Sequence, residues 1–185
     1  MALKETLASA FVFQQRNCMM PYLVALYIAL PAFIANMAPV FAAKLDLPKR
    51  FSRPISARLL GENKTWRGFI AGVLGGVIAA LLQWFVFAPH FASISHAFFF
   101  GALGGAGALV GDSAKSFLKR RLKIPPGRPF IPLDYVDYMI GFLLFTYPLY
   151  SWSMQDVVFL VAAVIILNPL TNLFGYITGI KNTYW

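Results

Sequence analysis

Charged residues are scarce in this chain of 185 residues, and acidic residues are scarcer than basic ones. Only 12% of the residues are charged, whereas a soluble domain usually carries about 25%. No charged residue stands between Arg67 and Asp112, and 59% of the whole chain is hydrophobic. This number of charges is too small to cover the surface of a water-soluble domain. The sequence therefore predicts a protein that lies in a membrane.

Cysteine is almost absent, since Cys18 is the single one. The chain therefore offers neither a disulfide framework nor a cysteine metal cluster. A phosphate-binding P-loop is absent as well, because its pattern would need glycine at positions 58 and 63, where Arg58 and Asn63 stand. No recognisable nucleic-acid-binding module accompanies the basic residues, so we expect no nucleic acid partner.

Long apolar runs dominate what is present. The charge-free stretch of 44 residues at 68–111 can hold two helical spans joined by a turn near Pro89, because each span needs roughly 20 residues. Further apolar runs predict spans at about 19–43, 136–153 and 157–178. The expected fold is an all-α polytopic integral membrane protein of one domain, with about five transmembrane helices and with cytoplasmic loops that form a charged cavity.

Lysine and arginine are unevenly distributed over these spans. Seven of the sixteen lie in the loop at about 44–67 and six in the loop at about 113–135, whereas only Lys4 and Arg16 fall on the opposite side. Loops rich in these residues stay in the cytoplasm, so we expect the N-terminus outside and the C-terminus in the cytoplasm. The basic face could also bind anionic lipid headgroups, or do no more than set the topology. The residues before the first span fit an amphipathic helix at the outer interface.

Polar side chains recur at helical spacing where the charge-free stretch ends. Asp112, Lys115, Ser116, Lys119 and Arg120 follow the i, i+3, i+4, i+7, i+8 pattern of one helical face. A helix that leaves the membrane with one wet face would show the same pattern. Asp112, however, stands at the edge of the hydrocarbon, where a carboxylate is costly without a partner. Its position favours a functional site.

Two more carboxylates, Asp134 and Asp137, stand three residues apart at the start of the expected fourth span. Carboxylates at this spacing lie on the same side of a helix and repel each other. Together with Asp112 they could supply the hard oxygen ligands of Mg²⁺, which keeps waters and substrate phosphates in its coordination shell. Salt bridges to nearby lysines and arginines are the alternative explanation.

The segment "GENKTWRG" at 61–68 supplies further groups that can bind phosphate. Lys64, Thr65 and Arg67 can all donate hydrogen bonds to phosphate oxygens, lysine as a point charge and arginine as a two-pronged fork. This segment therefore predicts part of an anion-binding site.

Two polar elements interrupt apolar spans at about the same depth. Asn36 and Pro39 lie near the cytoplasmic end of the first span, and Asn168, Pro169 and Asn172 lie at that depth in the last. Asparagine can satisfy backbone groups that a proline frees, so a kinked helix that satisfies itself is one reading. A polar cavity that opens to the cytoplasm is the other.

One long stretch, "GDSAKSFLKRRLKIPPGRPFIPLDYVDYMIG", resembles the signature of CTP-dependent phosphatidate cytidylyltransferases: S-x-x-K-R, then P-G, then D-x-x-D. The match falls on Ser116, Lys119, Arg120, Pro126, Gly127, Asp134 and Asp137. The chain is more similar still to the archaeal branch, the CDP-archaeol synthases, in "GENKTWRG" and in the asparagine and proline of the first span. Bacterial members have a lysine–aspartate step and a histidine–glycine–glycine run where this chain has "KI" and "RPF", which favours an archaeal ether lipid as substrate.

The resemblance implies transfer of a cytidylyl group from CTP to an isoprenoid glycerol phosphate lipid that carries two geranylgeranyl chains, with release of pyrophosphate. It implies Mg²⁺ on Asp112, Asp134 and Asp137, and Lys115 and Lys119 as further catalytic groups. The residues expected to bind the substrates are Lys64, Thr65, Arg67, Ser116, Arg120, Asn36, Asn168 and Asn172. Two other functions stay open: a CTP-dependent polyprenol or dolichol kinase, which would release CDP, and a small anion transporter.

Overall fold

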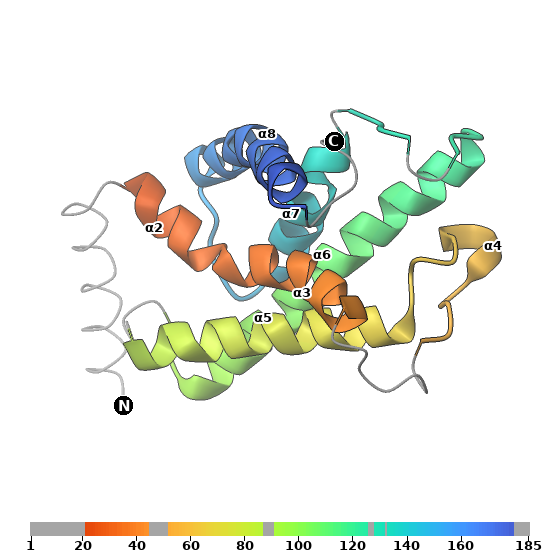
Figure 1. Ribbon diagram of the computed structural model, residues 1–185. Coiled ribbons are helices and arrows are strands. Elements are labelled where there is room, and N and C mark those ends of the chain that lie inside the picture. The colour runs from red at the N-terminus through yellow and green to blue at the C-terminus, as the bar shows by residue number, and fades with distance from the viewer. Residues whose placement is uncertain (1–20, 45–51, 87–90, 126–127, 132, 180–185) are drawn as a thin grey trace, which may run out of the picture.

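The computed structural model describes residues 21–44, 52–86, 91–125, 128–131 and 133–179. Within these ranges the regular elements are helices, and the only β-contact is an isolated bridge between Pro54 and Thr65. The helices in Figure 1 are α2 (Pro21–Ile28), α3 (Leu30–Lys44), α4 (Ala57–Leu60), α5 (Trp66–Val86), α6 (Ile94–Arg121), α7 (Leu133–Thr146) and α8 (Met154–Ile177). The predicted N-terminal interfacial helix and the turn at Pro89 lie outside the described residues.

Three helices are long and apolar enough to cross a membrane. They are α5, α6 and α8, with 21, 28 and 24 residues. The pair α2 and α3 is a fourth candidate if its two parts, which meet at a bend of 41°, are counted as one span. The helices predicted within 68–111 and at 157–178 are confirmed, whereas the total of five spans is not.

The span predicted at 136–153 is wrong in its second half, because α7 ends at Thr146. With 14 residues, α7 is shorter than the roughly 20 that a spanning helix needs. Pro148 disfavours a helical conformation for the residue before it, which ends the helix here. The hydroxyl of Thr146 donates to the carbonyl oxygen of Phe142 at 2.8 Å and accepts from Nε1 of Trp152 at 3.0 Å, so this helix end is fixed in place.

The bend between α2 and α3 follows from a proline. Pro31 has no N–H, so the carbonyl group of Tyr27, four residues earlier, cannot receive its helical hydrogen bond. Nε2 of Gln83 on α5 donates to this carbonyl group instead, and Gln83 is only 4% exposed. The bent segment is thereby fastened to α5.

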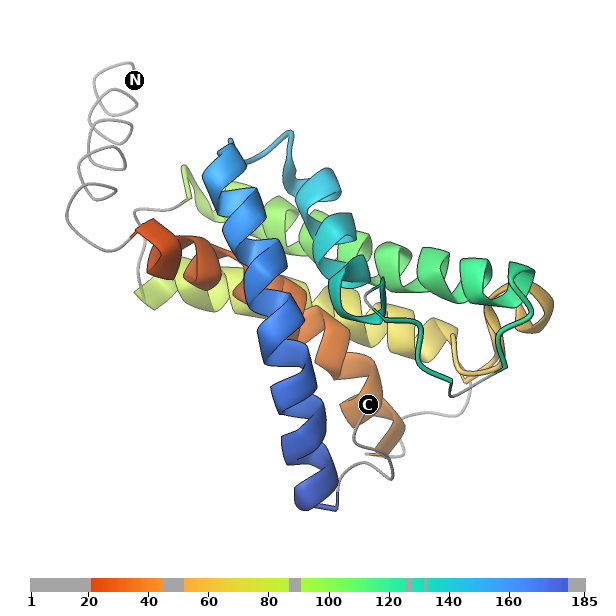
Figure 2. The ribbon, with the colours of Figure 1, turned by 90° about the horizontal axis from the view of Figure 1, so that it is seen from above.

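Helix α6 packs against α5 and α7, and both crossings use glycines (Figures 1 and 2). Glycines four residues apart on a helix let two backbones approach closely. A Cβ atom at Gly111 would overlap the carbonyl oxygen of Asp137, and one at Gly141 would overlap that of Gly107. No larger residue fits this crossing, which places Asp112 beside the first turns of α7.

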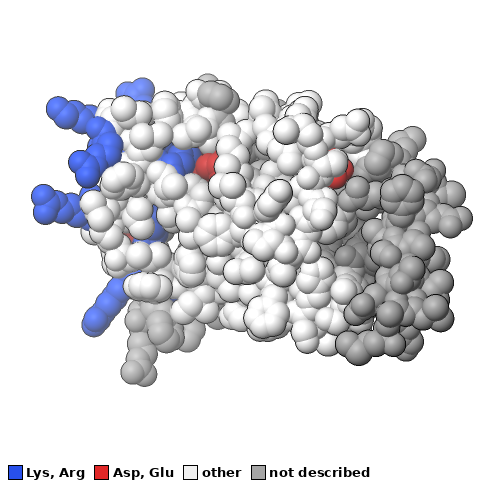
Figure 3. Space-filling view, turned by 180° about the vertical axis from the view of Figure 1, so that it is seen from behind, with Lys and Arg blue, Asp and Glu red and all other residues white. Residues whose placement is uncertain are grey.

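Lysine and arginine side chains gather at one end of the molecule, which α4 and the last turns of α6 form (Figure 3). The rest of the face in view is nearly free of charge. Large apolar side chains are exposed along the helices, for example Leu82 at 58%, Leu144 at 68% and Ile166 at 63%. A surface of this kind is suited to lipid, and its basic end agrees with the predicted concentration of charge on one face.

Candidate functional site

Six charged side chains from three segments meet in one group, which we call the carboxylate–lysine cluster. Helix α6 contributes Asp112, Lys115 and Lys119, the first turns of α7 contribute Asp134 and Asp137, and the segment before α5 contributes Lys64. Their side chains are mostly buried, with exposed fractions between 4% for Asp137 and 24% for Lys64. Sequence analysis predicted all six, and the fold brings them together.

Lys115 lies at the centre of the cluster. Its Nζ atom is 3.0 Å from Oδ1 of Asp112, 3.4 Å from Oδ1 of Asp134 and 2.7 Å from Oδ2 of Asp137. One ammonium group therefore contacts the three carboxylates that were predicted to share a cation.

Two other lysines complete the charge balance. Lys64 forms an ion pair with Asp112, so the segment before α5 is tied to α6. Nζ of Lys119 lies 3.2 Å from each carboxylate oxygen of Asp134 and donates to the carbonyl oxygen of Arg128 at 2.6 Å. Three cations thus face three anions.

The cluster shifts the pKa of two members. Burial lowers the pKa of Lys64 to about 8, the charge of Lys115 acts in the same direction, and Asp137 opposes them. Burial alone would raise the pKa of Asp134, but the N–H of Phe130 and the nearby lysine charges outweigh burial and lower it. Asp134 is therefore ionised at neutral pH, while the buried charge of Lys64 would be stabilised by an incoming anion.

The predicted magnesium site is not preformed in this arrangement. Among the described residues, no group of three or more Asp, Glu, His or Cys side chains is close enough together to hold a metal ion. Lys115 bridges the carboxylates, as the salt-bridge alternative predicts. One feature still fits a cation: Oδ2 of Asp137 is buried and receives no hydrogen bond within the described part of the chain, although Nζ of Lys115 is near. Such oxygens are the ligands that Mg²⁺ prefers.

The two predicted hydroxyl groups hold local backbone. Oγ1 of Thr65 accepts from the N–H of Gly68 at 3.2 Å and so caps α5. Oγ of Ser116 donates to the carbonyl oxygen of Asp112 at 2.9 Å, one turn earlier on α6. Arg67 lies half-buried in the first turn of α5. Thr65 and Ser116 thus hold the helix turns next to two members of the cluster, Lys64 and Lys115.

The predicted asparagines lie on two helices. Nδ2 of Asn168 donates to the carbonyl oxygen of Tyr135 at 2.6 Å, so this amide connects α8 to α7 rather than satisfying its own helix. Tyr135 stands between the two carboxylates of α7, which makes the contact a support for the cluster. Asn36 on α3 and Asn172 on α8 are half-buried.

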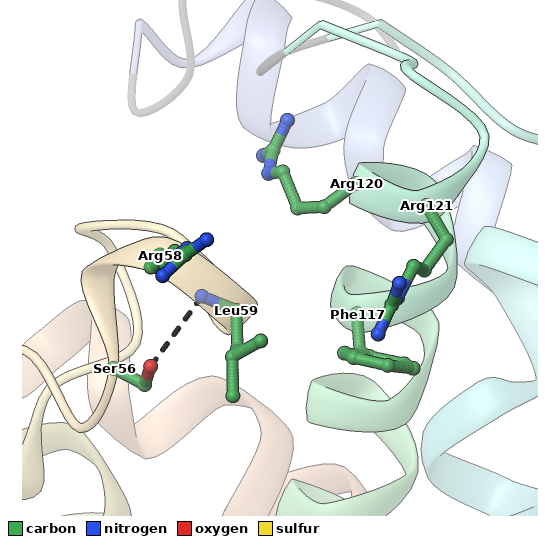
Figure 4. Close-up of a pocket in the computed structure, with 6 residues that line it drawn as sticks. All are labelled: Ser56, Arg58, Leu59, Phe117, Arg120 and Arg121. Atoms are coloured by element: carbon green, nitrogen blue, oxygen red, sulfur yellow. Dashed lines mark hydrogen bonds between the residues drawn. The ribbon is translucent and has the colours of Figure 1, made fainter.

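A second feature is a pocket of about 460 Å³ between α4 and the end of α6 (Figure 4). Its lining residues are Ser56, Arg58, Leu59, Phe117, Arg120 and Arg121. Sequence reasoning predicted a charged cavity formed by the loops that contain these residues, but not this lining. Only Arg120 was predicted as a site residue, because Arg58 and Arg121 belong to no motif. The close crossing at Gly107 and Gly111 was also missed, although their spacing of four residues is a signal for it.

The helices and the cluster together define an all-α intramembrane protein with a buried ionic site. The family model described as "CarS-like: CDP-archaeol synthase" matches residues 18–185. The chain is 35% identical to the CDP-archaeol synthase of Pyrococcus furiosus over 170 residues, which cover 90% of this chain and 100% of that protein. It is 36% identical to the CDP-archaeol synthase of Thermococcus kodakarensis over 169 residues, 87% of this chain and 95% of the relative.

A solved structure is similar as well. It is described as "Structural insight into an intramembrane enzyme for archaeal membrane lipids biosynthesis", and it matches with a TM-score of 0.70 and 34% sequence identity. The match covers 82% of this chain and 94% of the solved chain. The chain belongs to the CDP-archaeol synthase family. It is a multi-pass membrane enzyme, a CTP-dependent cytidylyltransferase of archaeal membrane lipid biosynthesis, and this sets the kinase and transporter alternatives aside.

Proposed function

We propose that the carboxylate–lysine cluster is the place where the cytidylyl group passes from CTP to the lipid phosphate. The main support is that Lys115 contacts three carboxylates at one mostly buried point. That point lies where the charge-free part of α6 ends, at Asp112. A water-soluble nucleotide and the phosphate of a membrane lipid can meet at such a boundary.

The proposed reaction does not need a side chain that acts as a general base. An oxygen of the lipid phosphate attacks the α-phosphorus of CTP, a new P–O bond forms, and the bond to the bridging oxygen breaks as pyrophosphate leaves with the electron pair. The attacking phosphate is already an anion near neutral pH. His96 lies at the opposite end of α6 from Asp112, which agrees with a mechanism without a histidine base. Catalysis then consists of positioning and charge neutralisation.

The lysines provide the neutralisation. Lys64, Lys115 and Lys119 each contact a carboxylate now, and phosphate oxygens would take over as their partners when the substrates bind. Arg67 and Arg120 add two-pronged donors, while Thr65 and Ser116 keep the adjacent helix turns in place for the nucleotide. A phosphate partner would stabilise the charge of Lys64, whose pKa burial lowers.

The three carboxylates fit a divalent cation once the lysines turn to the phosphates. Asp112, Asp134 and Asp137 would hold it, and the buried Oδ2 of Asp137, which Nζ of Lys115 now contacts at 2.7 Å, would become available to it. When bound, Mg²⁺ would supply charge neutralisation between the two reacting phosphates. When Lys115 turns to a substrate phosphate, the three carboxylates would therefore become available to the cation.

The acceptor that we propose is the isoprenoid glycerol phosphate with two geranylgeranyl chains. Asn36, Asn168 and Asn172 lie on apolar helices and would face its polar headgroup. The basic loops support a site on the cytoplasmic side, with the N-terminus outside and the C-terminus in the cytoplasm.

The test uses purified full-length protein in detergent, Mg²⁺ and CTP labelled either at the α- or at the γ-phosphate. We expect the α-label in the lipid extract and the γ-label in pyrophosphate when the isoprenoid phosphate is offered. Phosphatidate is the control acceptor. A faster reaction with phosphatidate would overturn the assignment of the isoprenoid lipid as acceptor. The γ-label in the lipid would overturn the proposed transfer of a cytidylyl group.

A further inference from the structure

Three guanidinium groups line the pocket between α4 and the end of α6, and its described lining contains no acidic residue. Arg58 projects from α4, while Arg120 and Arg121 project from the last turn of α6, and Figure 4 shows the three around one opening. Ser56 also borders it; its Oγ accepts from the N–H of Leu59 at 3.4 Å, so its hydroxyl hydrogen remains a donor.

Within the described residues, no acidic side chain balances these arginine charges. None of the three forms an ion pair with an acidic side chain in the described ranges, in contrast to the lysines of the cluster. Nη1 of Arg120 donates to the carbonyl oxygen of Ile124 at 2.9 Å, and the guanidinium of Arg121 lies 5.1 Å from the ring centre of Phe117. Like charges around a pocket of about 460 Å³ repel one another, so an anion bound there would be stabilised.

Helix α6 contributes residues both to the pocket and to the carboxylate–lysine cluster. A Cβ atom at Gly61 would lie 3.6 Å from Nε of Arg120, and three residues later Lys64 pairs with Asp112. The segment from Gly61 to Lys64 therefore runs beside α6 from the pocket to the cluster. Arg120 follows Asp112 by eight residues, roughly 12 Å along the helix axis. Arg120 thus lies on the same helix as Lys115 and Lys119, nearer to its C-terminal end.

We infer that this pocket binds the distal phosphates of the nucleotide, the two that leave as pyrophosphate, through Arg58, Arg120 and Arg121. The inference rests on the proposed function, because it requires the α-phosphate at the cluster. Arginine forks match phosphate oxygens in pairs, which suits a polyphosphate better than a neutral base. The pocket also lies two helical turns past the end of the charge-free stretch, a position that favours a water-soluble ligand over a lipid headgroup.

The experiment compares competition by CMP, CDP, CTP and inorganic pyrophosphate against labelled CTP, with the purified full-length protein in detergent. Arg58→Gln and Arg121→Gln remove two of the charges, and Arg53→Gln is the matched control, an exposed arginine outside the pocket. We expect both pocket variants to bind CTP and pyrophosphate about tenfold more weakly, or weaker still. Their affinity for CMP should not change, because CMP lacks the distal phosphates. The control should change none of them.

Two results would overturn the pocket assignment and leave the proposed function standing. One is an equal loss of affinity for CMP, CDP and CTP in a pocket variant that thermal unfolding shows to be folded. The other is a loss seen only in bilayers of anionic lipid and absent in detergent, which would assign the arginines to headgroups. If wild-type protein formed no CDP-lipid, the proposed function would fail, whereas pyrophosphate competition would still decide the pocket.

Discussion

The ammonium group of Lys115 lies 2.7 Å from Oδ2 of Asp137, a carboxylate whose side chain is only 4% exposed. Lys115 stands on α6 and Asp137 on α7, so this ion pair joins the two helices at their close crossing. A lysine in this position competes with any cation for the same oxygen atoms. Five predictions follow from this competition and from the packing around it.

Replacing Lys115 by methionine removes the partner of three carboxylates. We expect the free energy of unfolding to fall by about 3 kcal/mol, because an uncompensated buried charge remains. Added Mg²⁺ should raise the melting temperature of Lys115→Met more than that of wild type, since the metal would replace the lost charge. Thermal unfolding with and without Mg²⁺ measures this. An equal Mg²⁺ effect in both proteins would contradict the competition.

Asp137→Asn should lower kcat about 100-fold or more, because the variant loses a carboxylate that would hold the divalent cation. Asp156→Asn is the matched control: Asp156 caps the start of α8 together with Ser153, and asparagine can still cap a helix. We expect it to keep nearly full activity in the same CDP-lipid assay. Full activity of Asp137→Asn would show that this carboxylate takes no part in the reaction.

Lys64→Met should raise the KM for CTP about tenfold or more, while Lys64→Arg should recover part of the loss, because a cation is needed there. Asp112 loses its partner in Lys64→Met, so unfolding must be measured beside the kinetics. A change in stability without any change in KM would limit Lys64 to a structural role.

Gly111→Ala tests the crossing of α6 and α7. The new methyl group would overlap the carbonyl oxygen of Asp137. This oxygen belongs to the backbone, so it cannot move away by a change of side-chain rotamer. We expect a loss of about 1–3 kcal/mol from overpacking, together with lower activity. In the comparison variant Gly75→Ala, the Cβ atom would meet side chains of Ala38 and Ile34 at 3.2 and 3.3 Å. Its smaller effect on the melting temperature is the expected control result.

Asn168→Ala removes the hydrogen bond to the carbonyl oxygen of Tyr135. An interhelical bond of this kind is worth about 1 kcal/mol in a membrane, so the melting temperature should fall slightly. Thr171→Val, which removes a bond within α8 only, is the comparison. A rise in the KM for the lipid beyond this stability change would show that Asn168 also touches the substrate.

Sequence reasoning predicted the cluster well, because its residues follow helical spacing. Asp112, Lys115 and Lys119 share a face at i, i+3 and i+7, and the structure confirms the helix through Arg121. The two carboxylates of α7 also share one side. What spacing alone did not decide is the partner of these carboxylates, since a lysine and a metal ion satisfy the same oxygens.

The parts that sequence reasoning missed depend on contacts between distant segments. The end of α7 at Thr146 was misjudged because apolar residues continue past it, although Pro148 marks the break. The arginine pocket needs α4 beside the end of α6, and neither Arg58 nor Arg121 has a motif that predicts this neighbour. Pairings between helices are decided by packing, which hydropathy along one chain does not report.

The hydrogen bond from Gln83 to the carbonyl group of Tyr27 joins residues 56 positions apart. During synthesis the first span reaches the bilayer long before Gln83 does. The hydrogen bond from Gln83 can therefore form only after α5 has been inserted beside α2. A later helix thus holds the bend of 41° that Pro31 introduces between α2 and α3.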